Sequence, residues 1–157
     1  MNRETALPPG ISIRETELSD AVLDTLIAFS KDWEKEDSCR GYRTNTVEDI
    51  LGRRVFLAFD QDRPVGYLFG LTENTQKASS VMPAGTPCFE AEELYVLPAY
   101  RSRGIGAALF RAAAGAVRGE AAYITVSAAA KNWRAILHFY LEELGMEFWS
   151  ARLFMKL

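Results

Sequence analysis

The sequence predicts a mixed α/β (α+β) domain in which helices cover both faces of one central sheet. Three features predict it: an alternating segment at residues 11–17, two apolar runs around a polar turn at 55–71, and a strand–turn–helix–strand succession over 90–127. Elements that alternate in this way are typical of a sheet between helical layers. We expect a single domain over residues 1–157, with six to seven strands flanked by about four helices.

The first half of the chain contributes a strand, two helices and a hairpin. Ser19 or Asp20 can cap a first helix that runs to about Ser30, and the polar stretch 32–45 that follows is interpreted as a surface segment. Thr46 can cap a short helix through residue 51. The runs 55–60 and 65–71, joined by a turn that contains a proline, then form a hairpin.

The second half begins with a long loop over residues 72–88, followed by a strand at 90–97. A helix from Gly104 to Val117 and a strand at 122–127 complete a βαβ unit. A last helix starts at Asn132 and stops at Gly145. Residues 148–157 are expected to supply one or two closing strands.

Composition excludes several classes of protein. The net charge of −3 argues against a nonspecific nucleic-acid binder, which needs a basic surface to release counterions from phosphate. No apolar run approaches the ~20 residues that a membrane helix requires, and the N-terminus has no hydrophobic signal segment, so we expect a cytoplasmic protein. Cys39 and Cys88 lack metal-ligand spacing, so we expect neither a metal site nor a disulfide.

A glycine-rich turn between the strand at 90–97 and the next helix predicts a site for phosphate. Backbone N–H groups at a helix N-terminus attract anions, and Gly104 and Gly106 let a ligand approach the backbone closely. Arg101 and Arg103 add positive charge beside the turn. The residues after Gly106 fit neither a Walker loop nor a dinucleotide GxGxxG motif. The other interpretation of the glycine pair is an ordinary tight turn into a helix.

The segment LYVLPAYRSRGIGAAL resembles motif A of the GNAT acetyltransferases, R/Q-x-x-G-x-G/A, through Arg101, Gly104 and Gly106. The resemblance implies a GNAT fold and acetyl-CoA as cosubstrate. It also implies that the CoA pyrophosphate binds the turn residues Arg101, Ser102, Arg103, Gly104, Ile105, Gly106 and Ala107. By the same resemblance, Leu94, Tyr95 and Val96 hold the pantetheine and the thioester carbonyl.

Two neighbouring carboxylates, Glu92 and Glu93, are candidates for the catalytic base. An alkylamine with a pKa near 10.4 is mostly protonated at pH 7, so acetyl transfer needs a route for its proton. Side chains alternate across a strand, so we expect only one of the two to face a given side. The segment resembles that of polyamine acetyltransferases, which favours Glu92, and the other interpretation is that both are solvated or paired charges.

Tyr140 and Asn132 resemble residues of a later family motif, N-x-x-A-x-x-F-Y-x-x-x-G-F. The resemblance makes Tyr140 the acid that protonates the departing CoA thiolate and lets Asn132 contact the CoA chain. The spacing departs from the motif, with eight positions from Asn132 to Tyr140 in place of seven and five from Tyr140 to Gly145 in place of four. Tyr140 also lies on an apolar stripe, and Asn132 can equally act as a helix cap.

The resemblance implies an N-acetyltransferase that acts in a ternary complex on a primary amine of a polyamine-like or aminoglycoside-like molecule or of a peptide. The segment after the first helix is expected to cover the acceptor, through Trp33, Glu34, Glu36, Asp37 and Tyr42, whose charges and rings suit a cation. A non-catalytic acetyl-CoA-binding module is the alternative. The apolar residues 148–157 lie where many GNAT proteins pair, which implies a homodimer.

Overall fold

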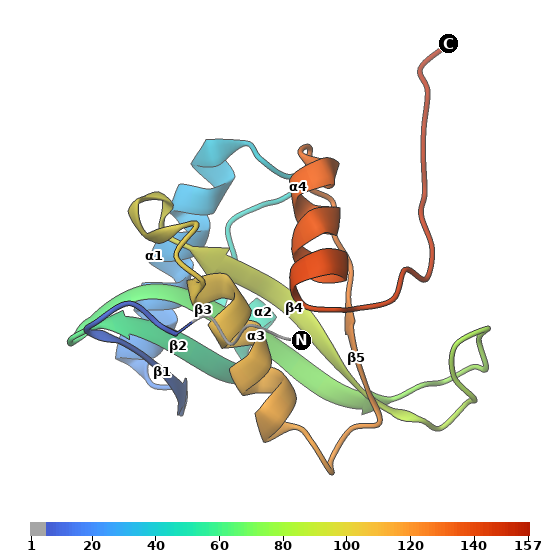
Figure 1. The fold of residues 1–157 in the computed structure, drawn as a ribbon, viewed down its shortest axis with the longest axis horizontal. Coiled ribbons are helices and arrows are strands. Elements are labelled where there is room, and N and C mark those ends of the chain that lie inside the picture. The colour runs from blue at the N-terminus through green and yellow to red at the C-terminus, as the bar shows by residue number, and fades with distance from the viewer. Residues whose placement is uncertain (1–5) are drawn as a thin grey trace.

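The computed structural model describes residues 6–157 and forms one five-stranded sheet with helices on both faces (Figure 1). The strand order is β1-β2-β3-β4-β5; the first four strands are antiparallel, and β5 runs parallel to β4. The strands are β1 (Ile11–Thr16), β2 (Arg54–Asp60), β3 (Arg63–Asn74), β4 (Pro87–Val96) and β5 (Tyr123–Val126). The helices are α1 (Asp20–Glu36), α2 (Val47–Ile50), the 3₁₀ turn η1 (Pro98–Tyr100), α3 (Ile105–Ala116), α4 (Trp133–Leu137) and the π-helical η2 (His138–Glu143). The mixed α/β architecture predicted from the sequence is confirmed.

The sheet separates two apolar clusters. The cluster under α3 is built by side chains of β2, β3, β4 and α3 itself; among its largest buried members are Phe56, Leu68, Phe89, Leu109 and Phe110. The cluster under α1 and α2 contains Leu26, Ile50, Leu57, Tyr67, Phe69 and Tyr95. Residues of β4 therefore face α3 or face α1 and α2, depending on their position in the strand.

The first helix is longer than the sequence predicted. Ser19 caps it, since its Oγ accepts a hydrogen bond from the Val22 N–H at 3.3 Å, but the helix continues past Ser30 to Glu36. The expected end at Ser30 is wrong because Trp33, almost one turn further on, also packs against the cluster under α1. Asp37, in a left-handed conformation with φ of 49°, ends the helix.

A β-bulge interrupts β4 at Glu92. Gly70 of β3 pairs with Ala91 and Phe69 pairs with Glu93, so Glu92 is an extra residue with no partner in the register. A bulge bends its strand, and the pairing of β4 with β5 ends here, at Ala91 opposite Val126. From Glu92 to Val96, the edge of β4 on the β5 side has no strand partner among residues 6–157.

The predicted closing strands are not formed. Residues 148–157, which we call the C-terminal tail, contain no strand, and Figure 1 shows them running away from the body of the molecule. The sheet therefore has five strands within the described part of the chain rather than the expected six or seven. The tail lacks a neighbouring strand to bond its backbone, which is the physical reason why its apolar pattern does not become a strand.

Candidate active site

The turn between β4 and α3 is shaped by two left-handed residues, Ser102 with φ of 59° and Gly104 with φ of 80°. Gly104 is the N-cap of α3, and the first helical hydrogen bond runs from the Ala108 N–H to the Gly104 carbonyl. No described residue accepts a hydrogen bond from the backbone N–H groups between Ser102 and Ala107. These groups, together with the helix dipole, can therefore bind an anion.

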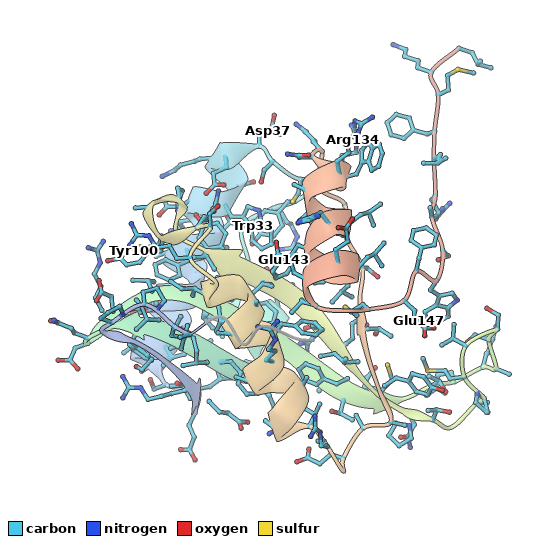
Figure 2. The ribbon with its side chains drawn as sticks, viewed as in Figure 1. Trp33, Asp37, Tyr100, Arg134, Glu143 and Glu147 are labelled. Carbon is cyan, nitrogen blue, oxygen red and sulfur yellow. The ribbon has the colours of Figure 1, made fainter. Side chains whose placement is uncertain are left out.

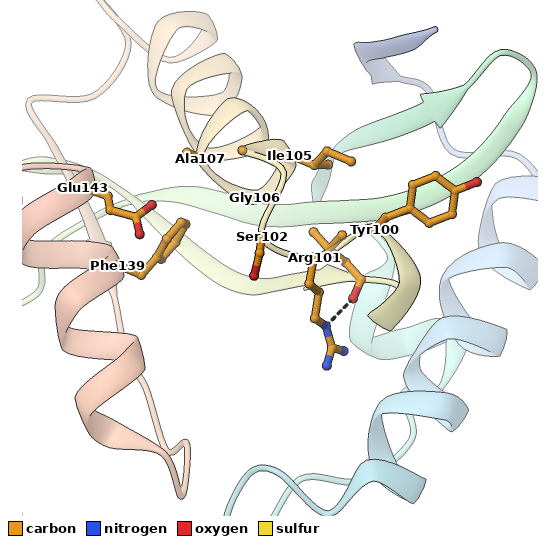
Figure 3. A pocket seen from close by; sticks show the side chains of 10 residues that line it. Tyr100, Arg101, Ser102, Ile105, Gly106, Ala107, Phe139 and Glu143 are labelled. Carbon is orange, nitrogen blue, oxygen red and sulfur yellow. Dashed lines mark hydrogen bonds between the residues drawn. The ribbon is translucent and has the colours of Figure 1, made fainter. Parts of the chain in front are cut away.

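A cavity of about 210 Å³ lies against this turn (Figure 3). Its lining consists of Val96, Tyr100, Arg101, Ser102, Gly104, Ile105, Gly106, Ala107, Phe139 and Glu143. A Cβ atom added at Gly106 would lie 3.5 Å from the Phe139 ring, so the absence of a side chain there leaves room between the turn and η2. The structure thus brings most of the predicted cofactor residues together around one cavity.

The two arginines of the turn are arranged differently from each other. Arg101 donates from Nε to the Val96 carbonyl at 2.8 Å and from Nη2 to both carboxylate oxygens of Glu36 at 2.8 and 2.9 Å. It therefore fastens the end of β4 to the end of α1. Arg103 is exposed, stacks 5.5 Å from the Tyr100 ring and forms no salt bridge with the residues described. Arg103 is the turn cation that remains available to a ligand.

The unpaired edge of β4 leads from this turn toward Glu93. Leu94 and Val96 contact the cluster under α3, whereas the Tyr95 side chain lies in the cluster under α1. Tyr95 donates from its hydroxyl to Glu36 at 2.6 Å. These three residues therefore expose mainly backbone groups to an extended ligand. Such groups can form hydrogen bonds with the ligand as the edge of a sheet does with a peptide.

Glu93 is the centre of a partly buried polar cluster on the α1 and α2 side. Its Oε2 accepts hydrogen bonds from Tyr67 Oη at 2.7 Å, Asn45 Nδ2 at 2.9 Å and Tyr42 Oη at 3.2 Å. Its Oε1 has no hydrogen-bond partner among residues 6–157. Burial raises the pKa of Glu93 above its ordinary value, although the three donors oppose that rise. Burial also raises the pKa of Tyr67, and the nearby Glu93 charge adds to the rise.

Aromatic rings lie beside the Glu93 cluster. The Trp33 ring lies 4.3 Å from the Tyr42 ring, centroid to centroid and tilted by 32°, and it stacks on the Tyr95 ring at 5.3 Å. Figure 2 shows Trp33 between α1 and the helix formed by α4 and η2. Its indole Nε1 donates to Ser38 Oγ at 3.2 Å, which fixes the ring orientation. Aromatic rings beside a carboxylate are a combination suited to a cation.

The three acidic residues expected at the acceptor site are bound to other side chains. Glu34 accepts from Thr44 Oγ1 at 2.5 Å, Glu36 is held by Arg101 and Tyr95, and Asp37 pairs with Lys131 at 2.7 Å. Trp33 and Tyr42 are the expected residues that do reach the site, by contact with Tyr95 and with Glu93 respectively. Sequence reasoning missed Asn45 and Tyr67, because neither carries a motif and Tyr67 lies within an apolar run.

Glu92 has a different environment from its neighbour. Arg53 binds both of its carboxylate oxygens, through Nε at 2.8 Å and Nη2 at 3.0 Å. The side chains of this pair remain about a quarter exposed, at 28% for Glu92 and 26% for Arg53. Glu92 therefore forms a bidentate ion pair near the surface rather than part of the Glu93 cluster.

The last helix contains a π-helical segment, η2, in the region where the sequence has one residue more than the family motif. The Leu144 N–H bonds to the Phe139 carbonyl, five residues earlier, at 3.1 Å, and such a turn accommodates one extra residue. Phe139 lines the cavity at the turn, while Tyr140 packs edge-on against Phe110 of α3. Burial raises the pKa of Tyr140 to about 12, with a smaller contribution from Cys39. Asn132 Oδ1 accepts from the Ala135 N–H at 3.3 Å and so caps α4.

Two short segments join the acceptor side to α4. The Arg40 N–H bonds to the Ala129 carbonyl and the Lys131 N–H bonds to the Ser38 carbonyl, each at 2.9 Å. With the Lys131–Asp37 ion pair, these bonds connect the loop after α1 to the loop before α4. The segment just before Tyr42 is thereby held beside the loop that leads into α4.

The described residues show neither a metal cluster nor a membrane helix. Within 6–157, no group of three or more His, Cys, Asp or Glu side chains is arranged to hold a metal ion. None of the helices in the same range has the length and apolar character needed to cross a membrane.

One protein family matches most of this chain. The sequence profile of the Acetyltransferase (GNAT) family matches residues 22–146, a range that includes the glycine turn, the Glu93 cluster and the last helix. This chain belongs to the GNAT acetyltransferase family. A search of curated proteins found no match.

Solved structures share the fold at low sequence identity. An aminoglycoside acetyltransferase from an uncultured soil metagenomic sample, in complex with trehalose, is 18% identical with a TM-score of 0.65, over 94% of this chain and 97% of that chain. The aminoglycoside N-acetyltransferase AAC(6')-Iy in complex with CoA is 17% identical with a TM-score of 0.66, over 92% and 98%. The ribosomal-protein-alanine N-acetyltransferase of Brucella melitensis biovar Abortus 2308 is 14% identical with a TM-score of 0.64, over 94% and 99%.

Proposed function

We propose that this protein is an acetyl-CoA-dependent N-acetyltransferase that acetylates a primary amine of a small molecule or peptide in a ternary complex. The observation that carries the proposal is the position of Glu93. This partly buried carboxylate, with one unbonded oxygen, lies on the strand whose open edge leads to the glycine turn. The cofactor site and a proton acceptor are thus two parts of one continuous surface.

The residues around the turn fit CoA by their own chemistry. The free N–H groups from Ser102 to Ala107 and the exposed Arg103 suit a pyrophosphate. Gly106 leaves its cavity open, and the unpaired edge from Glu92 to Val96 offers backbone groups to an extended amide-containing chain. When bound, acetyl-CoA supplies the acetyl group in activated form, as a thioester.

We propose that Glu93 accepts the proton of the acceptor amine, directly or through a water molecule. The three donors on Oε2 hold the carboxylate in one orientation and leave Oε1 to face an ammonium group. Burial raises the pKa of Glu93 toward neutrality, which makes it a stronger base than an ordinary glutamate. The sequence favoured Glu92 for this role, but Arg53 occupies both of its oxygens.

Tyr140 remains a candidate for protonating the CoA thiolate, with a weaker basis than Glu93. Its pKa of about 12 lies well above the ordinary thiol value near 8.5, so its donation of a proton is energetically unfavourable. Its ring packs against Phe110, while the neighbouring Phe139 lines the cavity. We therefore expect Tyr140 to contribute less to the rate than Glu93 does.

The acceptor side favours an amine that is positively charged when it binds. Tyr42 bonds to Glu93 and lies beside the Trp33 ring, and such rings attract ammonium groups by cation–π interaction. Polyamine-like and aminoglycoside-like amines and peptide amines meet this requirement. Two of the compared structures carry the name aminoglycoside acetyltransferase, which supports testing that class first.

The test is an acetyl-transfer assay that follows thiol release across a panel of polyamines, aminoglycosides and peptides with free amines. We expect release that depends on both acetyl-CoA and one class of amine, with the acetylated product identified by mass spectrometry. CoA binding measured by calorimetry serves as the control for an intact cofactor site. Tight binding of CoA without turnover of any amine would instead favour the non-catalytic acetyl-CoA-binding module.

A further inference from the structure

Tyrosines aside, two polar residues are buried within the described part of the chain, and they are bonded to each other. Ser30 of α1 is 0% exposed, and Asn45, in the segment between α1 and α2, is 9% exposed. The Asn45 backbone N–H donates to Ser30 Oγ at 2.7 Å. A buried polar group without a partner destabilises a fold, so this bond accounts for the burial of both groups.

Ser30 lies on the apolar face of α1. It follows Leu26 by four residues and precedes Trp33 by three, and both of these residues pack in the cluster under α1. Residues at this spacing share one face of a helix. Such a face usually carries apolar side chains, and the hydroxyl at this position contacts the Asn45 backbone instead of solvent.

The segment that Ser30 holds carries two of the three donors to Glu93. Asn45 Nδ2 and Tyr42 Oη donate to Glu93 Oε2 at 2.9 and 3.2 Å. Asn45 therefore bonds to α1 through its backbone and to β4 through its side chain. The position of the Ser30 hydroxyl thus determines where the Asn45 amide meets the carboxylate.

The other bonds from this segment to neighbouring helices lie at the surface. Arg43 pairs with Asp49 at 2.8 Å, and Thr44 Oγ1 donates to Glu34 at 2.5 Å, and both contacts are exposed. Water competes with exposed bonds, whereas a bond in a low-dielectric interior is electrostatically stronger. The bond to Ser30 is the buried one, so we expect it to restrain the segment most.

We propose that Ser30 is a positioning residue for the Glu93 carboxylate, which it holds in orientation through Asn45. The inference rests on the proposed function only in naming Glu93 as the base. Without the Ser30 hydroxyl, the buried Asn45 N–H loses its acceptor, so the segment shifts toward another partner and its donors withdraw from Oε2. Ser30 is uncharged and does not line the cofactor cavity, so its effect on the reaction passes through these donors.

The titration of Glu93 reports whether the donors are in place. Charged and titratable groups reach this carboxylate from the segment between α1 and α2, from β3 and from β4: Tyr42, Arg43, Tyr67 and Glu92. Burial raises the pKa of Glu93, the bonded donors lower it, and the Glu92 charge adds to the rise. Substitution of Ser30 removes no charge, so a change in this titration would come from displaced donors.

The first test is a carbon NMR titration of the Glu93 carboxyl, assigned by its absence in Glu93→Gln. In Ser30→Ala we expect the midpoint to rise by about one pH unit, because the donors stabilise the ionised form. Thr25→Ala is the matched control, since the Thr25 hydroxyl donates to the Ala21 carbonyl of the same helix at 2.9 Å. It should leave the midpoint unchanged.

A second variant guards against loss of folding in Ser30→Ala, which its melting temperature reports. Ser30→Cys fills the space with a thiol that accepts hydrogen bonds only weakly, so its midpoint should also rise. An unchanged Glu93 midpoint in the folded Ser30 variants, or an equal rise in Thr25→Ala, would overturn the inference.

The second test separates this inference from the proposed function by kinetics across pH. If Glu93 is the base, Ser30→Ala moves the acid limb of the kcat profile to higher pH, with a several-fold loss near neutrality that recovers at high pH. CoA affinity by calorimetry should be unchanged, and in a Glu93→Gln background the same substitution should change kcat little. A pH-independent loss that persists in that background would overturn the inference. A raised NMR midpoint with an unaltered kcat profile would instead contradict Glu93 as the base, and with it the proposed function, while Ser30 would still orient the carboxylate.

Discussion

The two parts of the proposed site along β4 offer different kinds of groups to a ligand. Toward the glycine turn, the site consists mainly of backbone groups from one continuous segment, residues 92–107. Toward α1 and α2, it consists of side chains brought together from distant segments, with Trp33, Tyr42 and Tyr67 grouped around Glu93. We call residues 92–107 the cofactor half of the proposed site and the Glu93 cluster with its aromatic neighbours the acceptor half. Binding in the cofactor half would depend on backbone conformation, whereas binding in the acceptor half would depend on the identity of individual side chains.

The largest effect expected on the acceptor side comes from Glu93→Gln. Gln keeps the shape and the bonds to Tyr67 and Asn45 but cannot accept the proton, so kcat at neutral pH should fall about 10²-fold. Acetyl-CoA affinity should be preserved, and part of the loss should return at high pH, where the amine is already deprotonated. Steady-state kinetics across pH measures this result.

Glu92→Gln is the matched control for that variant. It removes one charge of the ion pair with Arg53 but leaves the Glu93 cluster in place, so kcat should stay nearly unchanged. The reverse order of effects would make Glu92 the base, and an unchanged pH profile in both variants would mean that the amine loses its proton in bulk water.

On the cofactor side, Gly106→Val should weaken CoA binding at least ten-fold, or by about 1.4 kcal/mol. A single Cβ at this position is in ordinary contact with Phe139 at 3.5 Å, but the branched side chain fills the cavity at the turn. Gly106→Ala should have a smaller effect, and both variants should retain the wild-type melting temperature to within a few degrees. Calorimetry with CoA measures the affinities. An undiminished affinity in Gly106→Val would show that the CoA pyrophosphate does not bind at this turn.

Tyr67→Phe tests the acceptor side through pH dependence. The Tyr67 hydroxyl stabilises the ionised form of Glu93 and so lowers its pKa. Without that hydroxyl the pKa of Glu93 rises further, more of the carboxyl is protonated at a given pH, and the acid limb of the kcat profile moves to higher pH. We expect a several-fold loss near neutrality that largely disappears at high pH. A pH-independent loss would assign Tyr67 a purely structural role.

The smallest effect is expected from Tyr140→Phe, a change in η2, which lies beside the proposed cofactor cavity. Because burial raises the pKa of Tyr140 to about 12, its loss should lower kcat less than the Tyr67→Phe change does. Single-turnover and steady-state rates of thiol release measure this effect. A loss as large as that of Glu93→Gln would identify Tyr140 as the principal proton donor to the thiolate.

Much of the cofactor half could be predicted from the sequence because its information is local. Gly104 and Gly106 follow a strand and open a helix, and that pattern alone indicates an anion site. The structure brings most of the turn residues to one cavity, although Arg103 does not line it and the Arg101 side chain, which does, is also bound to Glu36. A long flexible side chain can reach several partners, and the choice among them depends on α1, which is distant in sequence.

The Glu93 cluster and the C-terminal tail could not be predicted from local sequence patterns. The Glu93 cluster needs α1, α2, β3 and β4 to be in place before Tyr42, Asn45 and Tyr67 meet. Simple alternation along β4 also fails at the bulge. The tail, read as closing strands, has an apolar pattern but no neighbour in the single chain. The homodimer, the cytoplasmic location and the lack of a metal stay predictions.

The bulge at Glu92 suggests that the site depends on the length of β4 as well as on its chemistry. Ala91 and Leu94 both face the cluster under α3, although in a strand without a bulge residues three apart lie on opposite faces. The extra residue Glu92 restores them to the same face. Deleting position 92 would leave Glu93 opposite Phe69, with its side chain still toward Tyr67. The straightened strand could then pair with β5 beyond Ala91, closing the open edge. Deletion of residue 92 would thus keep the Glu93 carboxylate in place but remove the unpaired edge of β4. A substitution of Glu92 would change only the charge.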